Sequence, residues 1–182
     1  MNFSNAAREL DVDEATVRAV AEVESNGKGF LSSGEPKILF ERHVFYKRLK
    51  AKGINPDLAP PDICSPSAGG YKGGIEEHAR LKRAVLIDRD AALESASWTA
   101  FQIMGYHWRL MGYARLQDFI NDAYKSEEEH LMMFVRFIKA NEAMHAALVN
   151  KHWSTFARLY NGPAYAKNNY DVKLEKAYKT YV

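Results

Sequence analysis

The sequence predicts a mainly α-helical protein: a helical bundle around one buried central helix, with a small β-hairpin near residues 29–40. Apolar residues recur at helical spacing through most of the 182-residue chain. Proline and glycine gather in two stretches, residues 53–74 and 161–163, and both read as loops. The composition, 47% hydrophobic and 26% charged, is that of a folded soluble protein. We therefore expect a single domain over residues 1–182.

In chain order, helical periodicity predicts seven helices. They cover Glu14–Ser25, Glu41–Ala51, Glu76–Ile87, Ala91–Ser95, Leu116–Tyr124, Glu127–Met144 and Trp153–Leu159. Between the first two, short apolar runs at Phe30–Leu31 and Ile38–Phe40 flank the turn-forming stretch Ser32–Pro36, which favours a hairpin.

The segment Glu127–Met144 has the most continuous apolar surface. Leu131, Phe134, Val135 and Ile138 follow helical spacing, with further Met and Phe residues beside them. A helix that is apolar over such a wide arc is usually the centre of a bundle. We interpret its Met and Phe side chains as core and not as a ligand site.

Composition excludes several classes of protein. The single cysteine, Cys64, allows no internal disulfide. The longest apolar run, Leu131–Val135, is far shorter than the ~20 residues of a spanning helix, and Met1–Leu10 does not look like a signal peptide. With a net charge of +2, binding to a polyanion would need a local patch.

Metal and phosphate chemistry have no support in the sequence. The 6 histidines form no His-Glu-x-x-His pair, Cys64 has no partner cysteine, and no Gly-rich phosphate loop is present. We expect no metal and no other cofactor. Cys64 as a nucleophile is disfavoured, because no helix start lies beside it to lower the pKa of its thiol.

Glu24 is a carboxylate on the apolar face of its helix. At about 100° per residue it continues the stripe of Val17, Val20 and Ala21, whereas Glu22 points to the opposite side. Apolar packing and the negative end of the helix dipole both raise a carboxyl pKa. A carboxyl protonated near neutral pH suits a general acid for glycosidic cleavage. The plainer alternative is a boundary residue in a salt bridge or in water.

Three blocks, in this order, resemble the N-acetylmuramidase domain of bacteriophage endolysins. They are AVAEVESNGKGFL with the following PKILFERHVF, then RDAALESASWTAFQIMGYHW, then FARLYNGPAYAKNNYDVKLEKAY, and the match runs from about Leu10 to Tyr178. The stretch Ala19–Gly27 is also similar to the Glu-Ser helix end of the goose-type lysozyme and lytic transglycosylase superfamily.

The resemblance implies a lysozyme-like fold that cleaves the β-1,4 bond between N-acetylmuramic acid and N-acetylglucosamine in peptidoglycan. It implies that Glu24 is the catalytic acid and that residues 101–105 line the sugar cleft. The substrate-binding residues expected on this basis are Ser25, Phe101, Gln102, Met104, Tyr106, Tyr160 and Asn161. Two positions depart from the family pattern: Thr99 stands where glycine is expected, and His107-Trp108 replaces an Asn-containing pair.

The residue types of these blocks agree with a sugar site. Sugars present hydroxyl and N-acetyl groups together with flat C–H faces, so their sites combine aromatic rings with neutral hydrogen-bonding groups. Residues 98–108 supply both kinds around Gly105, and Tyr160 and Asn161 form a second such cluster. The structural alternative is that the aromatic residues beside this glycine pack in the core next to a turn.

The second catalytic carboxyl remains open in the sequence. Glu41 follows an apolar strand and opens a helix, where it acts either as a catalytic group on a water or as a structural residue at the helix start. Asp62 and Glu94 are further candidates. A retaining glycosidase needs its second carboxyl at about 5 Å and an inverting one at about 6.5–9.5 Å. An enzyme with the acid alone would release a 1,6-anhydro sugar or use the substrate's own groups.

The alternatives to a muramidase are a lytic transglycosylase and a non-catalytic wall-binding module. Arg8–Arg18 also looks like part of a helix-turn-helix. The helix that would contact DNA, Glu14–Glu24, holds three Glu and one Arg, whereas a recognition helix needs outward Lys or Arg for phosphate and base contacts.

We expect peptidoglycan strands as the partner, no nucleic acid, no stable membrane insertion and a monomer. Without a signal peptide, the enzyme would stay in the host cytoplasm until a holin-type breach releases it to the periplasm and wall. Lys173, Lys176 and Lys179 could help it approach an anionic envelope, or simply form a solvated helix face.

Overall fold

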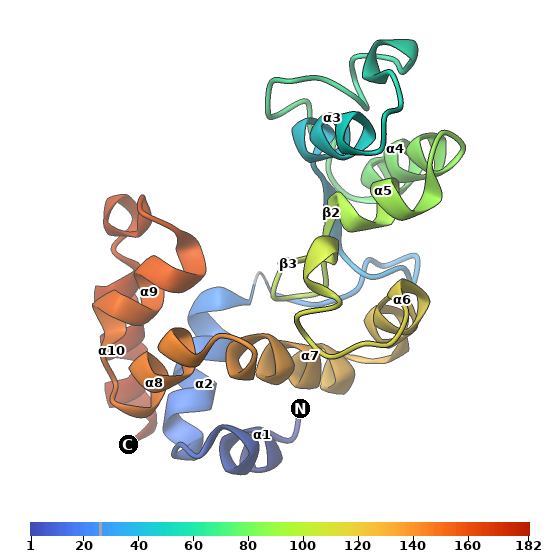
Figure 1. Cartoon of the computed structure of the whole chain (residues 1–182). Coiled ribbons are helices and arrows are strands. Elements are labelled where there is room, and N and C mark those ends of the chain that lie inside the picture. The colour runs from blue at the N-terminus through green and yellow to red at the C-terminus, as the bar shows by residue number, and fades with distance from the viewer. Residues whose placement is uncertain (26) are drawn as a thin grey trace.

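The computed structural model describes residues 1–25 and 27–182, and it divides into two helical lobes joined by a small sheet (Figure 1). The larger lobe contains α1 (Phe3–Leu10), α2 (Glu14–Glu24), α6 (Leu116–Lys125), α7 (Glu127–Lys139), α8 (Glu142–Val149), α9 (Trp153–Asn161) and α10 (Tyr170–Tyr181). The smaller lobe contains α3 (Arg42–Ala51), α4 (Ile75–Val85) and α5 (Arg89–Glu94). Both the mainly α class and the central helix are thereby confirmed.

The sheet has three short antiparallel strands in the order β1 (Ile38–Phe40), β2 (Ala96–Trp98) and β3 (Ile103–Met104). Leu39 pairs with Ser97, and Ser97 pairs with Met104, so these three side chains form a row on one face. Their neighbours along the strands, including Phe40, Trp98 and Ile103, are buried on the other face. The sheet therefore joins the lobes through a core face and leaves a more open face beside them.

The β-hairpin predicted near residues 29–40 has less strand pairing than expected. Leu31 donates its backbone N–H to Glu35 O, and Lys37 donates to Gly29 O, both at 2.8 Å, but only one bridge forms, between Phe30 and Pro36. The strand Ile38–Phe40 pairs instead with β2, far along the chain. Burial of Ile38 and Phe40 against Trp98 accounts for that long-range choice.

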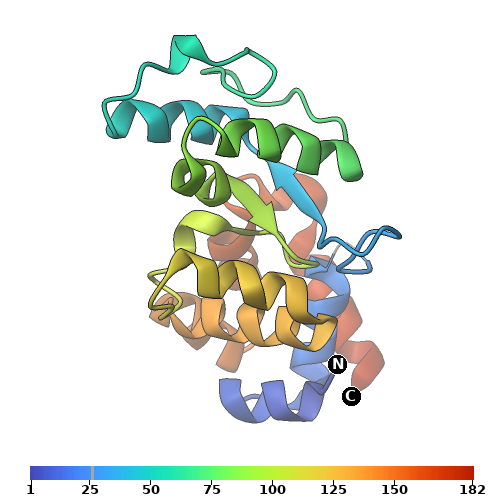
Figure 2. The same ribbon diagram turned by 90° about the vertical axis from the view of Figure 1, so that its right-hand side faces the viewer.

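Helix α7 is the buried centre of the larger lobe, and Figure 2 shows it beside α6 under the sheet. Leu131, Phe134 and Ile138 are completely buried. The predicted segment Glu127–Met144 is wrong in one respect, because the helix ends at Lys139. Asn141 then starts α8 by accepting the N–H of Met144 at 3.0 Å, as a favoured N-cap residue does.

The other six predicted helices are present, with their ends moved by at most two residues. Three helices of the described chain were not predicted as separate elements. They are α1, which buries Ala6, Ala7 and Leu10, α10, which buries Leu174 and Ala177, and α8, whose first residues the prediction joined to α7. Among the described residues, no helix combines the length and the apolar character that crossing a bilayer requires.

Candidate active site

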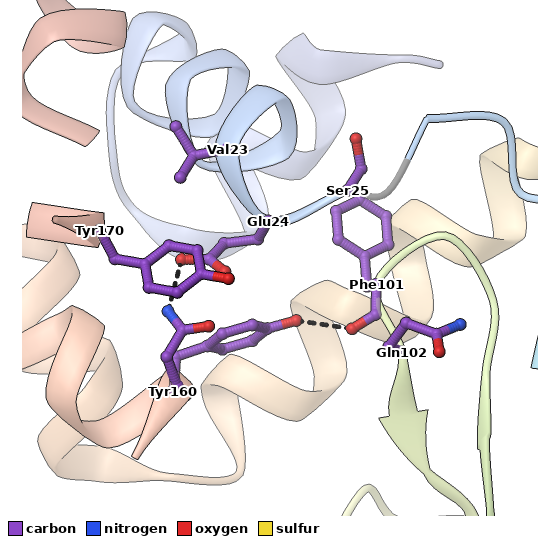
Figure 3. A pocket seen from close by; sticks show the side chains of 8 residues that line it. Val23, Glu24, Ser25, Phe101, Gln102, Tyr160 and Tyr170 are labelled. Carbon is purple, nitrogen blue, oxygen red and sulfur yellow. Dashed lines mark hydrogen bonds between the residues drawn. The ribbon is translucent and has the colours of Figure 1, made fainter. Parts of the chain in front are cut away.

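An open pocket of about 320 Å³ lies where the end of α2 faces the β2–β3 turn and the α9–α10 connection (Figure 3). Its lining is mostly polar and aromatic: Val23, Glu24, Ser25, Phe101, Gln102, Tyr160, Asn161 and Tyr170. Three parts of the chain that are far apart in sequence therefore build one site.

Glu24 is the last residue of α2 and the acidic group of this pocket. Val17, Val20 and Ala21 on the same helix face are buried, as their spacing predicted. Asn161 donates its side-chain N–H to Glu24 Oε1 at 2.9 Å. Burial raises the pKa of Glu24 to about 7, although the Asn161 hydrogen bond and the positive charge of Lys173 act in the opposite direction.

Tyr160 fixes the neighbouring wall of the pocket. Its hydroxyl donates to the backbone oxygen of Phe101 at 2.9 Å, and its ring stacks on Phe156 and meets Phe134 edge-on. Burial and the nearby Glu24 carboxyl raise the pKa of Tyr160 far above its usual range, so the hydroxyl stays a donor. α9 ends at Asn161, and Gly162 follows as its C-cap with φ +79°, which leaves Asn161 at the helix end facing Glu24.

The opposite wall is the β2–β3 turn, in which Gln102 is held by hydrogen bonds with Ser97 of β2 and Thr99 of the turn. Gln102 Nε2 donates to Thr99 O at 2.8 Å, and the Ser97 hydroxyl donates to Gln102 Oε1 at 2.9 Å. In Figure 3 the Gln102 side chain accordingly extends away from Glu24. Both amide groups have partners within the turn, so Gln102 offers a preset polar edge to the pocket.

Thr99 has φ +73°, a conformation that is strained for a β-branched residue. This explains why glycine is expected at this position. The residue is completely buried, and its hydroxyl accepts the N–H of Phe101 at 3.3 Å. Thr99 therefore keeps the turn that carries Phe101 and Gln102, at the cost of backbone strain.

Of the nine candidate residues from the sequence, the structure brings Glu24, Ser25, Phe101, Gln102, Tyr160 and Asn161 into the pocket lining. It adds Val23 and Tyr170, which sequence reasoning did not single out. Tyr170 lies within the third matched block, but it begins the unpredicted helix α10, so its direction could not be inferred.

Met104 and Tyr106 do not line this pocket. Met104 lies half-buried in the open row of the sheet, opposite Ser97, whose hydroxyl contacts Gln102. Tyr106 is 39% exposed and lies under the guanidinium of Arg48, 5.1 Å from the ring centroid. Both remain predictions as substrate contacts further along the sheet.

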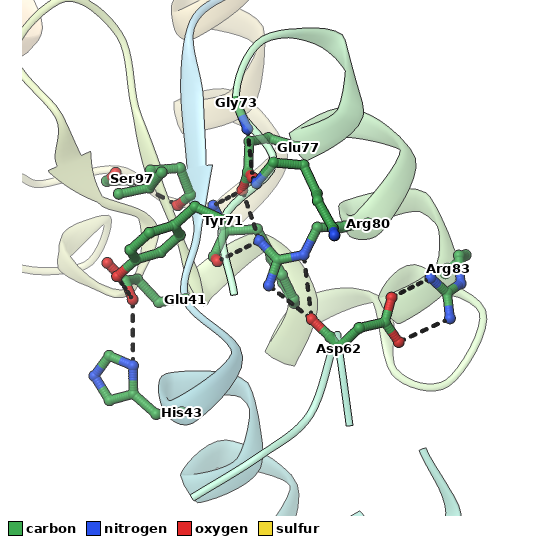
Figure 4. A network of polar contacts seen from close by, with 12 residues as sticks. Glu41, His43, Asp62, Tyr71, Gly73, Glu77, Arg80, Arg83 and Ser97 are labelled. Atoms are coloured by element: carbon green, nitrogen blue, oxygen red, sulfur yellow. Dashed lines mark hydrogen bonds and ion pairs between the residues drawn. The ribbon is translucent and has the colours of Figure 1, made fainter. Parts of the chain in front are cut away.

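Glu41 also lies outside the Glu24 pocket, at the start of α3 in the smaller lobe (Figure 4). Its Oε2 accepts the Tyr71 hydroxyl at 2.8 Å and lies 3.2 Å from His43 Nδ1. The side chain is 16% exposed. The structure thus places the two candidate catalytic carboxyls in different lobes.

The remaining candidate groups have other partners. Asp62 forms an ion pair with Arg83, and Glu94 accepts the indole N–H of Trp108 at 2.8 Å while pairing with Arg48. Burial raises the pKa of the Cys64 thiol, which disfavours a reactive thiolate. Within residues 1–25 and 27–182, no three His, Cys, Asp or Glu side chains are grouped as metal ligands.

A carboxyl with a pKa near 7 can donate a proton at neutral pH and then hold the resulting charge. Aromatic rings and amides around it suit a sugar. In a mainly helical molecule with a small sheet beside the pocket, this arrangement defines the class of lysozyme-like glycoside hydrolases.

Comparison with known proteins agrees with this class. A family model described as N-acetylmuramidase matches residues 13–182. The crystal structure of a Burkholderia AP3 phage endolysin superposes with a TM-score of 0.93 at 50% sequence identity, over 98% of this chain and 68% of that chain. No curated protein matches. The chain belongs to the N-acetylmuramidase family and is a peptidoglycan hydrolase.

Proposed function

We propose that this chain is an endolysin that cleaves the β-1,4 bond between N-acetylmuramic acid and N-acetylglucosamine, with Glu24 as the general acid. The observation that carries the proposal is the hydrogen bond from Asn161 to Glu24 Oε1 inside the pocket, together with the pKa of about 7. Membership of the family and the 50% identity to a phage endolysin support the substrate and the setting.

The geometry supports a specific division of labour between the two oxygens of Glu24. Oε1 accepts from Asn161, so Oε2 is the oxygen available to hold the proton. In the proposed step, Oε2–H protonates the glycosidic oxygen as the C–O bond breaks and positive charge develops on the sugar ring. The Asn161 amide and the Lys173 charge then stabilise the carboxylate that remains.

The rest of the pocket would bind the sugar on both its polar and its apolar sides. Tyr160, Tyr170 and Phe101 supply ring surface for C–H faces. Asn161, Ser25 and Gln102 supply neutral hydrogen-bonding groups near hydroxyl and N-acetyl groups.

The decisive experiment replaces Glu24 by Gln and by Ala. Loss of the general acid should lower the rate of fragment release from purified cell walls by about 10²–10⁴ or more. Glu24→Gln keeps the shape of the side chain and an oxygen facing Asn161, so circular dichroism and thermal unfolding should show a folded protein. Lysis by that folded variant at the wild-type rate would contradict the assignment.

Glu41 as the second catalytic group stays a prediction. If Glu41 activates the attacking water, Glu41→Gln should lose a rate factor comparable to that of Glu24→Gln, with KM little changed. If it serves only the Tyr71 and His43 contacts, the variant should retain most of kcat. Steady-state kinetics on soluble glycan strands separates the two outcomes.

One observation favours a lytic transglycosylase as the second candidate. Among the described residues that line the pocket, Glu24 is the only carboxyl group. An enzyme without a protein base can let the 6-hydroxyl of muramic acid attack its own anomeric carbon, with Glu24 taking up the proton. Mass spectrometry of the products decides: a reducing-end muramic acid indicates hydrolysis, and a 1,6-anhydro sugar indicates transglycosylation.

The biological setting follows from the same proposal. Residues 1–182 would act as one monomeric catalytic domain, made in the host cytoplasm and released to the wall when a holin-type breach opens the membrane. The 50% identical phage endolysin supports this setting. The enzyme then meets its substrate only at lysis.

A further inference from the structure

A second pocket of about 330 Å³ adjoins the Glu24 pocket, between α2 and α10. It is lined by Glu22, Val23, Lys173, Lys176, Ala177 and Thr180. Val23 lines both pockets, and α10 runs from Tyr170 in the first to Lys173 and Lys176 in the second. The two pockets are therefore neighbours along α2 and α10.

This second pocket has a net positive charge. Lys173 and Lys176 contribute two ammonium groups one helical turn apart, and Glu22 contributes one carboxylate. Glu22 Oε2 accepts the Tyr181 hydroxyl at 2.7 Å. No carboxylate of the described part of the chain lies within ion-pair distance of Lys173 or Lys176. Lys173 Nζ instead lies 5.3 Å from the ring centroid of Tyr170.

Lys179, on the same helix, has a different environment from Lys173 and Lys176. It forms an ion pair with Glu175 at 2.7 Å and does not line the pocket. Lys173 and Lys176 line the second pocket instead, and their nearest carboxylate there belongs to Glu22, which bonds with Tyr181. A ligand carboxylate in this pocket could form charge-assisted hydrogen bonds with the ammonium groups of Lys173 and Lys176.

We propose that the second pocket binds a carboxylate of the peptide stem attached to muramic acid. The inference rests on the proposed function, since it concerns the same substrate. Muramic acid carries its peptide through the lactyl group, so a stem on the muramic acid at the cleaved bond would bring its carboxylates to the neighbourhood of the bond that Glu24 is proposed to protonate. Peptide-bearing strands would then be bound more tightly than bare glycan.

Lys176 provides the test, because Lys173 acts on Glu24 and Lys176 is not in contact with it. With peptide-bearing glycan strands, Lys176→Gln should raise KM about threefold to tenfold and leave kcat nearly unchanged, as the loss of one solvent-exposed hydrogen bond of ordinary strength does. With strands freed of peptides by an amidase, the same variant should behave as the wild type.

Two further variants sharpen the experiment. Lys179→Gln removes the same charge from the same helix outside the pocket and should change neither substrate's KM. Glu22→Gln removes the carboxylate of the pocket while keeping an acceptor for Tyr181, so it should lower KM for peptide-bearing strands. Opposite shifts from Lys176→Gln and Glu22→Gln are expected only if the pocket holds an anion.

The outcomes separate this inference from the proposed function. If the wild type releases fragments from neither substrate, the proposed function fails. If it cleaves both, and Lys176→Gln raises KM equally for bare and peptide-bearing strands, or Lys179→Gln has the same effect, the inference is overturned. Calorimetric titration of peptide-bearing muropeptide into Glu24→Gln, with and without Lys176→Gln, measures the same difference without turnover.

Discussion

At the scale of single residues, the burial of the Glu24 carboxyl lowers the stability of the fold at high pH. Burial raises the pKa of the Glu24 carboxyl from the ordinary value of 4.5 to about 7. The folded protein therefore binds the carboxyl proton more tightly than the unfolded chain does. Stability from this group is complete below pH 4.5 and is lost as pH rises through about 7. Above that pH the folded state holds a poorly solvated charge.

Glu24→Gln should therefore stabilise the protein in alkaline buffer. A shift from 4.5 to about 7 corresponds to roughly 3 kcal/mol at most, at about 1.4 kcal/mol per pH unit. Urea unfolding at pH 5 and pH 9 measures it: the advantage of Glu24→Gln over wild type should grow with pH. An advantage that is the same at both values would contradict the raised pKa.

The pH dependence of activity should follow the titration of the Glu24 carboxyl. A general acid must be protonated before it acts, so kcat/KM for the wild type should fall as pH rises through about 7. Lys173→Gln removes a charge that lowers this pKa, so its descending limb should lie at higher pH. The measurement is a pH–rate profile on soluble glycan strands, with Lys179→Gln as the control that should not move the limb.

At the scale of elements, the segment after Glu24 is anchored to the central helix. Gly29 donates its N–H to Glu127 Oε1 at 2.9 Å, and the Phe30 ring stacks on His130 with centroids 4.7 Å apart. His130 is completely buried and its Nε2 bonds with Ala123 O. A Cβ on Gly29 would lie 2.2 Å from His130 Nδ1, so only glycine fits.

Gly29→Ala should destabilise the fold by about 1–3 kcal/mol through this overpacking. Activity should also fall, because Gly29 is only four positions along the chain from Ser25, which lines the Glu24 pocket. A double-mutant cycle tests the cause: His130→Ala lowers stability by itself, but in that background the added methyl group should cost much less. Equal costs in both backgrounds would point to another contact.

The sequence predicted elements best where one face is strongly apolar. Helix α7 was clear because its apolar arc is wide, whereas α10 buries little besides Leu174 and Ala177 and gave no comparable pattern. The three-stranded sheet was missed because β1 pairs with a strand almost sixty residues away. Local patterns do not specify such partners.

The lining of the Glu24 pocket could be predicted to a similar extent, and for a similar reason. Glu24 was found because a carboxyl interrupts an apolar stripe, and residues 101–102 and 160–161 because of the family resemblance. Tyr170 and the lysines at positions 173 and 176 join the site through the packing of α10 on α2. That packing depends on tertiary contacts, which no periodicity displays.

At the scale of the whole molecule, one buried ion pair organises the smaller lobe (Figure 4). Glu77 Oε2 accepts the N–H of Phe40 in β1 at 2.9 Å and pairs with Arg80 at 2.8 Å, and its Oε1 accepts the N–H of Lys72 at 2.6 Å. Arg80 donates to the backbone oxygens of Phe40 and Asp62. The Glu77–Arg80 ion pair thus connects β1 and the long loop to α4.

Glu77→Ala should cost about 3–5 kcal/mol, because it leaves the Arg80 charge buried without its partner. The loss should be greatest in the smaller lobe, since the contacts of this pair connect β1, the loop and α4. Hydrogen exchange should show faster exchange in α3 and α4 than in α7. The exposed pair of Arg83 with Asp62 is the control, because Arg83→Ala should cost about 1 kcal/mol or less.

The hydrogen bond between Asn161 and Glu24 joins residues 137 positions apart. A ribosome delivers α2 before α9 and α10, so the growing chain carries the Glu24 carboxyl before the pocket around it is complete. The pocket can form only after the chain has been extended through Tyr170, the last residue of its lining. A chain that stops before residue 160 would lack Tyr160, Asn161 and Tyr170, and with them one whole wall of the pocket, so it should release no fragments from cell walls.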